Sequence, residues 1–351
     1  MVYFTTFFDK NYLSRGIVLY ESLKANCLDF RLHVLCLDEE TFNYFQTNRD
    51  IYPDIISVKL QELEDADPDL RQAKSNRSKI EYYFTLSPCL PLYILKKFGL
   101  LHICSLDADI MFFSSVDPIF DLLKNFSIII TPHKFSKELL EDRRDRYGKF
   151  NVSFQIFKND VIGLSCLEDW RSKCINWCYD IYDETDGGRF ADQKYLDTWH
   201  RDYPGQVHSL EESSNGLAVW NIDNYEFSLH DRLVCADGKP VIFFHFHNFK
   251  ILKDNIALNG FDEYKVRKDS PVINQHIYLA YWEHLCRSSL SLASGSDLSI
   301  RQNLSVVIWK QLIVSGTFFL KVYGRIFNIN LVTLRKTIFS LKERYGAFTR
   351  P

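Results

Sequence analysis

The sequence lacks the features that mark several classes of protein. It has no uncharged apolar run of about 18 residues, the length that spans a bilayer as a helix. The longest apolar segment, Leu304 to Leu320, is interrupted by Lys310 and Gln311. There is also no internal repeat and no low-complexity segment. We therefore expect neither a membrane-spanning helix nor a repeat architecture.

Signs of disulfide bonding and secretion are missing as well. The nine cysteines are odd in number, form no CxxC pair, and lie partly in apolar runs, as Cys36 and Cys104 do. Cys174 and Cys178 lie one helical turn apart, but no nearby histidine or cysteine would complete a zinc site. Residues 1–6 have neither the basic start nor the cleavage site of a signal peptide. We expect buried free thiols and a cytoplasmic protein.

The chain has little excess charge, with a formal net charge of −3 over 351 residues, so it is not a general polyanion binder. We expect no nucleic-acid partner. Its 46% apolar, 15% aromatic and 25% charged residues exclude a disordered or collagen-like chain. The length suits one large α/β domain with an appendage. Residues 301–351 differ from the rest, because they hold nine Lys and Arg residues against a single acid, Glu343.

The first 135 residues alternate between short apolar runs and helical patterns, which predicts a parallel, doubly wound sheet. Pro88 and Pro91 should break or kink the helix expected over residues 78–98. The regularity falls after residue 135. The expected strands are 2–8, 31–37, 54–58, 101–106, 127–131, 151–157 and 241–247.

Two carboxylates, Asp107 and Asp109, flank Ala108 directly after the apolar run 101–106. In open α/β sheets, ligands bind beyond the carboxyl ends of the strands. Two acids there repel each other unless a proton or a cation joins them, and Mn²⁺ or Mg²⁺ would do so while holding a diphosphate. The alternative is a pair of loop acids that cap the turn at residues 115–117 and the helix after it.

A second polar group follows near residue 245. On a strand, His245 and His247 would point to the same face. A neutral imidazole can complete a Mn²⁺ shell that carboxylates begin, and Lys250 could meet a phosphate. Two half-buried, hydrogen-bonded histidines are the alternative.

Six segments in this order resemble motifs of GT-A glycosyltransferases, in particular glycosyltransferase family 8 and related bacterial enzymes of polysaccharide gene clusters. The resemblance covers roughly residues 1–275. It implies a Rossmann-like nucleotide-diphospho-sugar transferase domain with a mixed, mostly parallel sheet flanked by helices. Residues 276–351 would form a basic, helical C-terminal extension. The six segments are Phe4–Asp9, Ser75–Phe84, Leu106–Asp109, Phe150–Phe154, Ala191–Gln193 and His245–Lys250.

The resemblance implies a metal-dependent transferase that retains the anomeric configuration and takes a sugar from a UDP-sugar. The acceptor would be a glycan or a lipid-linked saccharide in surface polysaccharide synthesis. Asp107, Asp109 and His245, favoured over His247, would bind Mn²⁺ or Mg²⁺, and Asp192 and Gln193 would hold the sugar. The donor-binding residues would be Thr5, Thr6, Asp9, Tyr12, Arg77, Lys79, Asp107, Ala108, Asn151 and Lys250.

Three positions depart from the family pattern. Ser153 and Asn248 stand where the family commonly has glycine, and Lys250 is followed by Ile251 where the family has proline. Several motif residues also have plain structural alternatives. Arg77 and Lys79 could be solvated residues at a helix start, Asp192 a helix N-cap, and Thr5 and Thr6 ordinary strand-end residues.

The basic C-terminal segment predicts one amphipathic helix over residues 327–341. Its apolar residues recur at spacings of 4, 3, 4 and 3. Arg335, Lys336 and Lys342 fall largely off that face, which favours a peripheral contact with the anionic inner face of the plasma membrane. The alternative is a helical hairpin packed on the catalytic domain or on a second subunit. The apolar residues are Phe327, Leu331, Leu334, Ile338 and Leu341.

Two other functions compete with the transferase. One is a phosphatase of the haloacid-dehalogenase type with Asp107 as nucleophile, but Met111 stands where that motif has threonine or valine. The other is an inactive subunit of the same fold, which would bind a sugar nucleotide or serve assembly.

Overall fold

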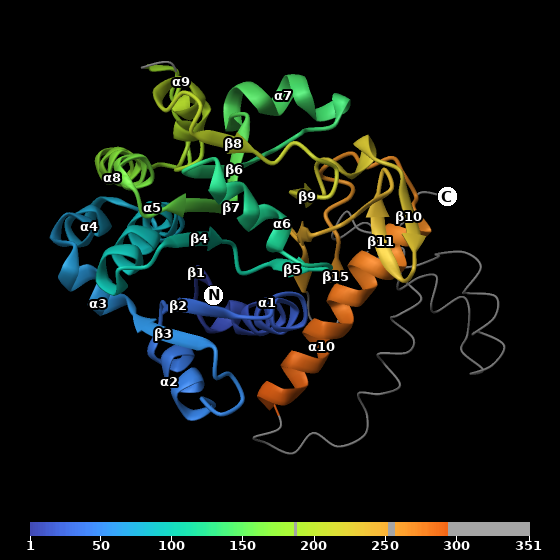
Figure 1. Ribbon diagram of the computed structural model, residues 1–351, viewed down its shortest axis with the longest axis horizontal. Coiled ribbons are helices and arrows are strands. Elements are labelled where there is room, and N and C mark those ends of the chain that lie inside the picture. Colours follow the sequence, from blue (N-terminus) through green and yellow to red (C-terminus); the bar gives the residue numbers. More distant parts are fainter. Residues whose placement is uncertain (186–187, 252–256, 294–351) are drawn as a thin grey trace.

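The computed structural model describes residues 1–185, 188–251 and 257–293. Its centre is a seven-stranded sheet with the order β3-β2-β1-β4-β7-β6-β8 (Figure 1). β7 runs antiparallel to both of its neighbours, and the other adjacent pairs are parallel. The predicted mixed, mostly parallel α/β sheet is confirmed. The strands are β1 (Val2–Phe8), β2 (Phe30–Cys36), β3 (Ile55–Lys59), β4 (His102–Leu106), β6 (Ile128–Pro132), β7 (Phe150–Lys158) and β8 (Val207–Ser209).

Helices connect the parallel strands and cover both faces of the sheet (Figure 1). β1 and β4 are adjacent and parallel, so their carboxyl ends meet at one edge. We call this the carboxyl edge, where an α/β sheet binds its ligands. The helices are α1 (Leu13–Asn26), α2 (Glu39–Thr47), α3 (Leu60–Ala66), α4 (Pro68–Ala73), α5 (Lys79–Phe98), α6 (Asp117–Phe120), α7 (Lys137–Tyr147), α8 (Val161–Asn176), α9 (Trp199–Asp202) and α10 (Leu279–Ala293).

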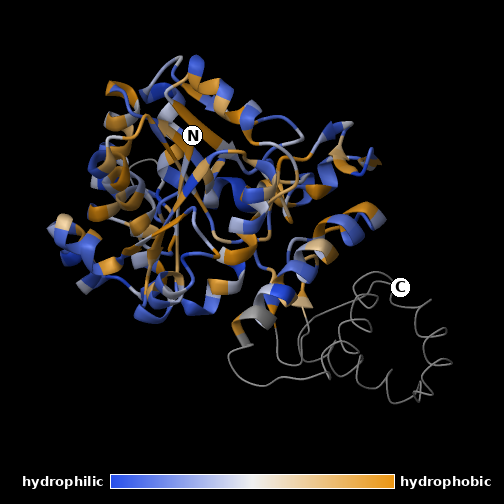
Figure 2. Cartoon of the chain, turned by 60° about the horizontal axis from the view of Figure 1, so that its bottom comes forward, coloured by the Kyte–Doolittle hydropathy of each residue, from blue (hydrophilic) through white to orange (hydrophobic). Residues whose placement is uncertain are grey.

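Alternation along the strands divides the interior into two cores. Phe4 and Phe8 of β1 pack with α1 on one face, whereas Tyr3 and Phe7 pack with the cluster that contains α5 and α8 on the other. Successive side chains of a strand point to opposite faces, and a sheet covered on both sides needs both sets to be apolar. In Figure 2 the central strands are mostly orange, while the surrounding helices and loops mix orange and blue.

Helix α5 corrects one prediction, because it runs unbroken through Pro88 and Pro91. Ser78 and Glu81 form a capping box at its start, and Gly99 ends it with a left-handed φ of 59°. Both prolines are buried, and α5 packs against α8. The packing of the helix outweighs the backbone hydrogen bonds that the two prolines remove.

A second layer extends the fold beyond the main sheet. A small sheet of β5 (Ile110–Phe112), β13 (Phe243–His245) and β9 (Leu217–Ala218) packs in a cluster with Tyr278 and Tyr281. A π-helical turn at Ile273–Tyr278 leads into α10, which lies against α1. The remaining strands are β10 (Phe227–His230), β11 (Leu233–Ala236), β12 (Lys239–Pro240), β14 (Lys250–Ile251) and β15 (Ala257–Leu258).

Two further predictions concern the whole chain. Eight of the nine cysteines are buried free thiols, as expected, and Cys286 is part-buried. Among the described residues no helix has both the length and the apolar character needed to cross a bilayer. The predicted helix over 327–341 lies outside the described residues, and the boundary at residue 275 stays a prediction.

Candidate active site

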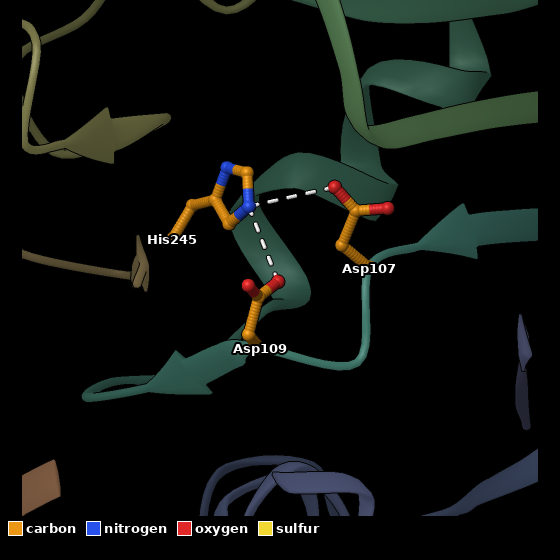
Figure 3. A group of neighbouring side chains, drawn as sticks. All are labelled: Asp107, Asp109 and His245. Carbon is orange, nitrogen blue, oxygen red and sulfur yellow. Dashed lines mark ion pairs between the residues drawn. The ribbon is translucent and has the colours of Figure 1, made fainter. Parts of the chain in front are cut away.

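Three side chains meet where β4 reaches the carboxyl edge (Figure 3). Asp107 and Asp109 lie in the connection between β4 and β5. β13 pairs with β5 so that His245 lies opposite Ile110, the residue after Asp109. Nε2 of His245 is 3.2 Å from Oδ1 of Asp109 and 3.5 Å from Oδ2 of Asp107.

The backbone fixes this geometry from two sides. The Asp107 N–H donates to the Ser153 carbonyl at 2.9 Å, which ties the loop to β7. The Phe246 N–H donates to the Asp109 carbonyl at 2.8 Å, which ties it to the end of β13. The three side chains are therefore held by neighbouring strands, and their convergence does not depend on a free loop.

The chemistry of this group fits a divalent cation. One ligand atom from each of Asp107, Asp109 and His245 lies within 4.8 Å of the others, and no second such group occurs in the described part of the chain. Two carboxylate oxygens and an imidazole nitrogen are ligands that Mn²⁺ and Mg²⁺ accept. The side chain of His245 is 6% exposed and that of Asp107 is 38% exposed, so the site opens on the Asp107 side.

Electrostatics couples the three groups. Desolvation and the like charge of Asp109 raise the pKa of Asp107 to about 7, against the opposing charge of His245. Desolvation also acts on Asp109, but the charge of His245 and its hydrogen bond together lower the pKa of Asp109 to about 2. Burial works against a charged His245, yet the two carboxylates raise its pKa overall. The two carboxylates thus favour positive charge between them, which a bound cation would supply.

His245, and not His247, lies against the carboxylates. β13 ends at His245, so the alternation expected for a longer strand does not extend to His247. The ring of His247 packs instead against Trp220 at 5.3 Å and Tyr264 at 5.7 Å, measured between centroids. Desolvation within the cleft and the charge of His245 lower the pKa of His247. Asn248, in a position where the resemblance leads us to expect glycine, has a left-handed φ of 60°, a conformation that asparagine tolerates.

The three side chains open into a cleft of about 810 Å³. It also gathers most of the residues that the motifs predict for the donor and its sugar. Those that line it are Asp9, Tyr12, Lys79, Asp107, Ala108, Asp109, Asn151, Asp192, Gln193 and His245.

Four predicted donor-binding residues do not line the cleft. Thr5 and Thr6 are buried inside β1, which runs on to Phe8 before it reaches the carboxyl edge. Arg77 donates to the Tyr179 hydroxyl at 2.7 Å and to two backbone carbonyls of the α8 C-terminus. Lys250 is exposed on β14.

One side of the cleft, which we call the β1–α5 wall, consists of Asp9, Tyr12, Lys79 and Tyr83. Oδ2 of Asp9 accepts a hydrogen bond from Nζ of Lys79 at 2.9 Å, and its Oδ1 accepts from the backbone N–H of Asn11. The Asp9 carboxylate raises the pKa of Lys79. Lys79 is the first residue of α5, so the positive end of that helix dipole also faces the cleft.

Asp192 lies deep in the cleft with part of its hydrogen-bonding capacity unused. The residue is 1% exposed, and its Oδ2 has no partner among the described residues. Burial raises its pKa to about 7. The preceding Ala191 has a left-handed φ of 46°, which is strained for alanine and turns Asp192 inward. Gln193 donates to the Tyr147 carbonyl at 2.9 Å, so this pair is anchored to the end of α7.

Asn151 is the other buried polar residue of the cleft. Its Oδ1 accepts hydrogen bonds from the backbone N–H of Ser153 at 3.0 Å and from the Ser153 hydroxyl at 2.5 Å. Its Nδ2 has no partner within the described chain. Ser153, which replaces an expected glycine, thus orients Asn151 and does not project into the cleft as a free hydroxyl.

The opposite side, which we call the α7 wall, was missed by sequence reasoning. In Figure 1, α7 lies above the β4–β5 connection and β1 lies below it. No motif marks these residues, which lie in the irregular part of the sequence. The only available signal is the i, i+4 spacing of Arg143 and Tyr147. The α7 wall consists of Phe135, Arg143, Tyr147, Trp220 and Tyr264.

Comparisons with known proteins give sequence relatives and fold neighbours. No protein-family model matches the chain. YfnD of Bacillus subtilis (strain 168), described as an uncharacterized protein, is 29% identical over 286 residues, which cover 81% of this chain and 89% of YfnD. YfnF of the same strain, also described as uncharacterized, is 29% identical over 259 residues, which cover 72% of this chain and 83% of YfnF.

Three solved structures are similar at low sequence identity. Mouse xyloside xylosyltransferase 1 is 13% identical, with 70% of this chain and 98% of that chain covered and a TM-score of 0.44. The glycosyltransferase GlyE of Streptococcus pneumoniae TIGR4 is 14% identical, with 85% and 66% covered and a TM-score of 0.45. The galactosyltransferase LgtC, solved with donor and acceptor sugar analogs, is 16% identical, with 86% and 98% covered and a TM-score of 0.45.

Proposed function

We propose that this protein is a metal-dependent glycosyltransferase that moves a sugar from a nucleoside-diphosphate sugar to a glycan or lipid-linked acceptor. The observation that carries the proposal is the Asp107, Asp109 and His245 group on the floor of a cleft at the carboxyl edge. This is where an α/β sheet binds a nucleotide, and the ligand set suits the cation that accompanies a diphosphate.

The leaving group needs positive charge more than it needs a strong acid. A divalent cation, Mn²⁺ or Mg²⁺, bound by these three residues would neutralise charge on the departing diphosphate. Lys79 and the start of α5 add positive charge from the β1–α5 wall. In the reaction, the bond between the anomeric carbon and the phosphate oxygen breaks, and its electron pair leaves with the diphosphate. A bond from the acceptor oxygen to that carbon forms, and the proton of the acceptor hydroxyl passes to the departing diphosphate or to solvent.

Asp192 and Gln193 would hold the transferred sugar. The unpartnered Oδ2 of Asp192 is a buried acceptor that a sugar hydroxyl would satisfy. Nδ2 of Asn151 is a buried donor that could serve the same sugar or the donor phosphate. Fixing the sugar in this way would orient its anomeric carbon toward the acceptor.

The finer parts of the proposal rest on the family resemblance. They are UDP as the nucleotide, a hexose as the sugar, retention of anomeric configuration, and a role in surface polysaccharide synthesis. A contact with the inner face of the plasma membrane rests on the basic, amphipathic pattern of residues 327–341.

The test is release of nucleoside diphosphate from a panel of sugar nucleotides, measured with Mn²⁺ and with a chelator. We expect slow, metal-dependent release from one donor, and its loss in Asp109→Ala. Asp121→Ala is the matched control, because Asp121 is an exposed carboxylate paired only with Lys124. Binding of Mn²⁺ and UDP without release from any donor and acceptor would favour the inactive subunit. Release of inorganic phosphate from small phosphoesters would favour the phosphatase, and failure to bind Mn²⁺ or UDP would refute the site.

A further inference from the structure

Arg143 is a basic side chain of the cleft that the proposed chemistry does not use. Its guanidinium carbon lies 4.4 Å from the centroid of the Tyr264 ring. Among the side chains that the structure describes, no carboxylate lies within ion-pairing distance of it. By contrast, Lys79 across the cleft is paired with Asp9. Glu263, the acid next to Tyr264 in the lining, accepts a hydrogen bond from the Asn248 amide.

The packing of α7 holds Arg143 toward the cleft. Leu139, Arg143 and Tyr147 are spaced at i, i+4 and i+8, so they share one face of the helix. Leu139 is 1% exposed and packs in a cluster with Trp220 and Tyr264, which anchors that face. Glu138 and Arg267 add an ion pair of 2.7 Å near the start of the helix. The half-buried guanidinium therefore has a fixed place on the wall.

The α7 wall reaches the metal-binding group through aromatic rings. The Trp220 ring lies 5.4 Å from His245 and 6.1 Å from Tyr264, measured between centroids. Trp220 and Tyr264 are each 5% exposed, so their rings form the buried support of the wall, and the Arg143 guanidinium lies over Tyr264 where the wall lines the cleft. Helix α7 and strand β1 lie on opposite sides of the β4–β5 connection (Figure 1). We place the nucleotide at the β1–α5 wall, which begins with Asp9 at the end of β1.

We propose that the α7 wall is an acceptor subsite that selects a saccharide carrying an anionic group, either a carboxylate or a phosphate; this inference rests on the proposed glycosyltransferase function. A planar guanidinium binds either anion through two parallel hydrogen bonds. The aromatic surroundings keep water away and strengthen the charge interaction. A half-buried cation with no carboxylate partner is unfavourable by itself, and an acceptor anion would supply that partner.

The test is binding of small glycosides to the protein loaded with Mn²⁺ and UDP, followed by ligand-observed NMR. The probes are p-nitrophenyl β-glucoside, p-nitrophenyl β-glucuronide, the methyl ester of the glucuronide, and p-nitrophenyl β-glucoside 6-phosphate. We expect one of the two charged glycosides to bind about tenfold or more tightly than its neutral counterpart. The charged glycoside that binds identifies carboxylate or phosphate as the selected group.

Variants then assign this preference to Arg143. In Arg143→Gln the charged and neutral glycosides should bind equally, whereas Arg143→Lys should keep part of the preference. Arg144→Gln is the matched control, since Arg144 is the exposed neighbour on the same helix. The preference should also weaken with added salt. No preference in the wild type, no binding of any charged glycoside, or an unchanged preference in Arg143→Gln would each overturn the inference.

The same samples separate this inference from the proposed function. UDP and Mn²⁺ binding is measured first by calorimetry. If the wild type binds neither, the proposed function fails. If it binds both and shows no preference for charged glycosides, only the acceptor inference fails. If UDP affinity falls in Arg143→Gln while the glycoside preference persists, Arg143 serves the nucleotide, and the acceptor inference is again refuted.

Discussion

The two walls of the cleft differ in how the chain builds them. The β1–α5 wall comes from the ends of regular, adjacent elements, and its charged residues are paired, as Asp9 and Lys79 are. The α7 wall comes from one helix and several loop residues that lie far apart in the sequence, from Phe135 to Tyr264. Its surface is aromatic, and its guanidinium at Arg143 has no carboxylate partner among the described residues.

This difference suggests that the two walls bind different parts of the substrates. A pre-paired, regular wall suits a ligand that is common to many enzymes, because its strand ends and helix start already provide a phosphate site. A wall made of irregular segments can change without disturbing the sheet, so it suits the part of the substrate that varies. Asp107, Asp109 and His245, which could hold a cation, line the cleft between the two walls.

The largest effect should come from Asp192, which lies where the walls join, since its neighbour Gln193 is bonded to the end of α7. Asp192→Asn keeps the shape and removes the charge. We expect transfer to fall by about 100-fold, because a buried acceptor for a sugar hydroxyl is lost. Binding of Mn²⁺ and UDP should persist. Steady-state kinetics and calorimetry test this, and unchanged transfer would show that Asp192 only supports the fold.

The same variant should be more stable than the wild type at high pH. Burial raises the pKa of Asp192 from 3.8 to about 7, so between these values the folded protein keeps a proton that the unfolded chain has lost. The free energy of unfolding contributed by this group therefore falls as pH rises through that window. The Tm advantage of Asp192→Asn should grow from pH 5 to pH 8 by the equivalent of a few kcal/mol at most. A pH-independent difference would contradict this, and Asp121→Asn is the exposed control.

How much of this architecture follows from the sequence depends on the range of the contacts involved. Apolar runs predicted the main strands, their alternation with helices predicted a parallel sheet, and the family resemblance implied a mixed, mostly parallel one. The prolines of α5 were misjudged because local propensity predicts a break, whereas burial of residues 85–92 depends on packing against α8. Such packing joins segments that a local pattern does not connect.

Prediction of the site was limited in the same way, because some of its residues meet only through contacts between distant segments. Asp107 and Asp109 were placed correctly at the end of a strand, because that position depends on a single element. Thr5 and Thr6 were also predicted to bind the donor from the end of a strand, yet β1 continues to Phe8 and both threonines are buried. The α7 wall could not be foreseen, because Arg143, Trp220 and Tyr264 become neighbours only after folding.

Near the β1–α5 wall, variants of Lys79 and Arg77 should distinguish a residue that binds the donor from one that stabilises the fold. Lys79 has a side chain 70% exposed and lines the cleft, so Lys79→Ala should weaken UDP binding about fivefold and leave Tm nearly unchanged. Arg77 holds Tyr179 and the end of α8, so Arg77→Ala should lower stability by about 2 kcal/mol and leave UDP affinity nearly unchanged. Thermal unfolding of both variants measures the change in stability, and calorimetry measures the change in UDP affinity. Equal losses of UDP affinity in the two variants would show that Arg77 also binds the donor.

The smallest effect should come from Ser153→Gly, which restores the residue that the family resemblance leads us to expect. The variant loses the hydroxyl that donates to Asn151, but it keeps the backbone N–H that donates to the same oxygen. Asn151 should therefore stay oriented, and UDP-sugar affinity should change by less than about threefold. Glycine in a strand should lower stability by about 0.5–1 kcal/mol. Ser153→Ala separates the two effects, because it removes only the hydroxyl. A large loss of affinity in both variants would mean that the Ser153 hydroxyl, and with it the departure from the family pattern, is required to position Asn151 for the donor.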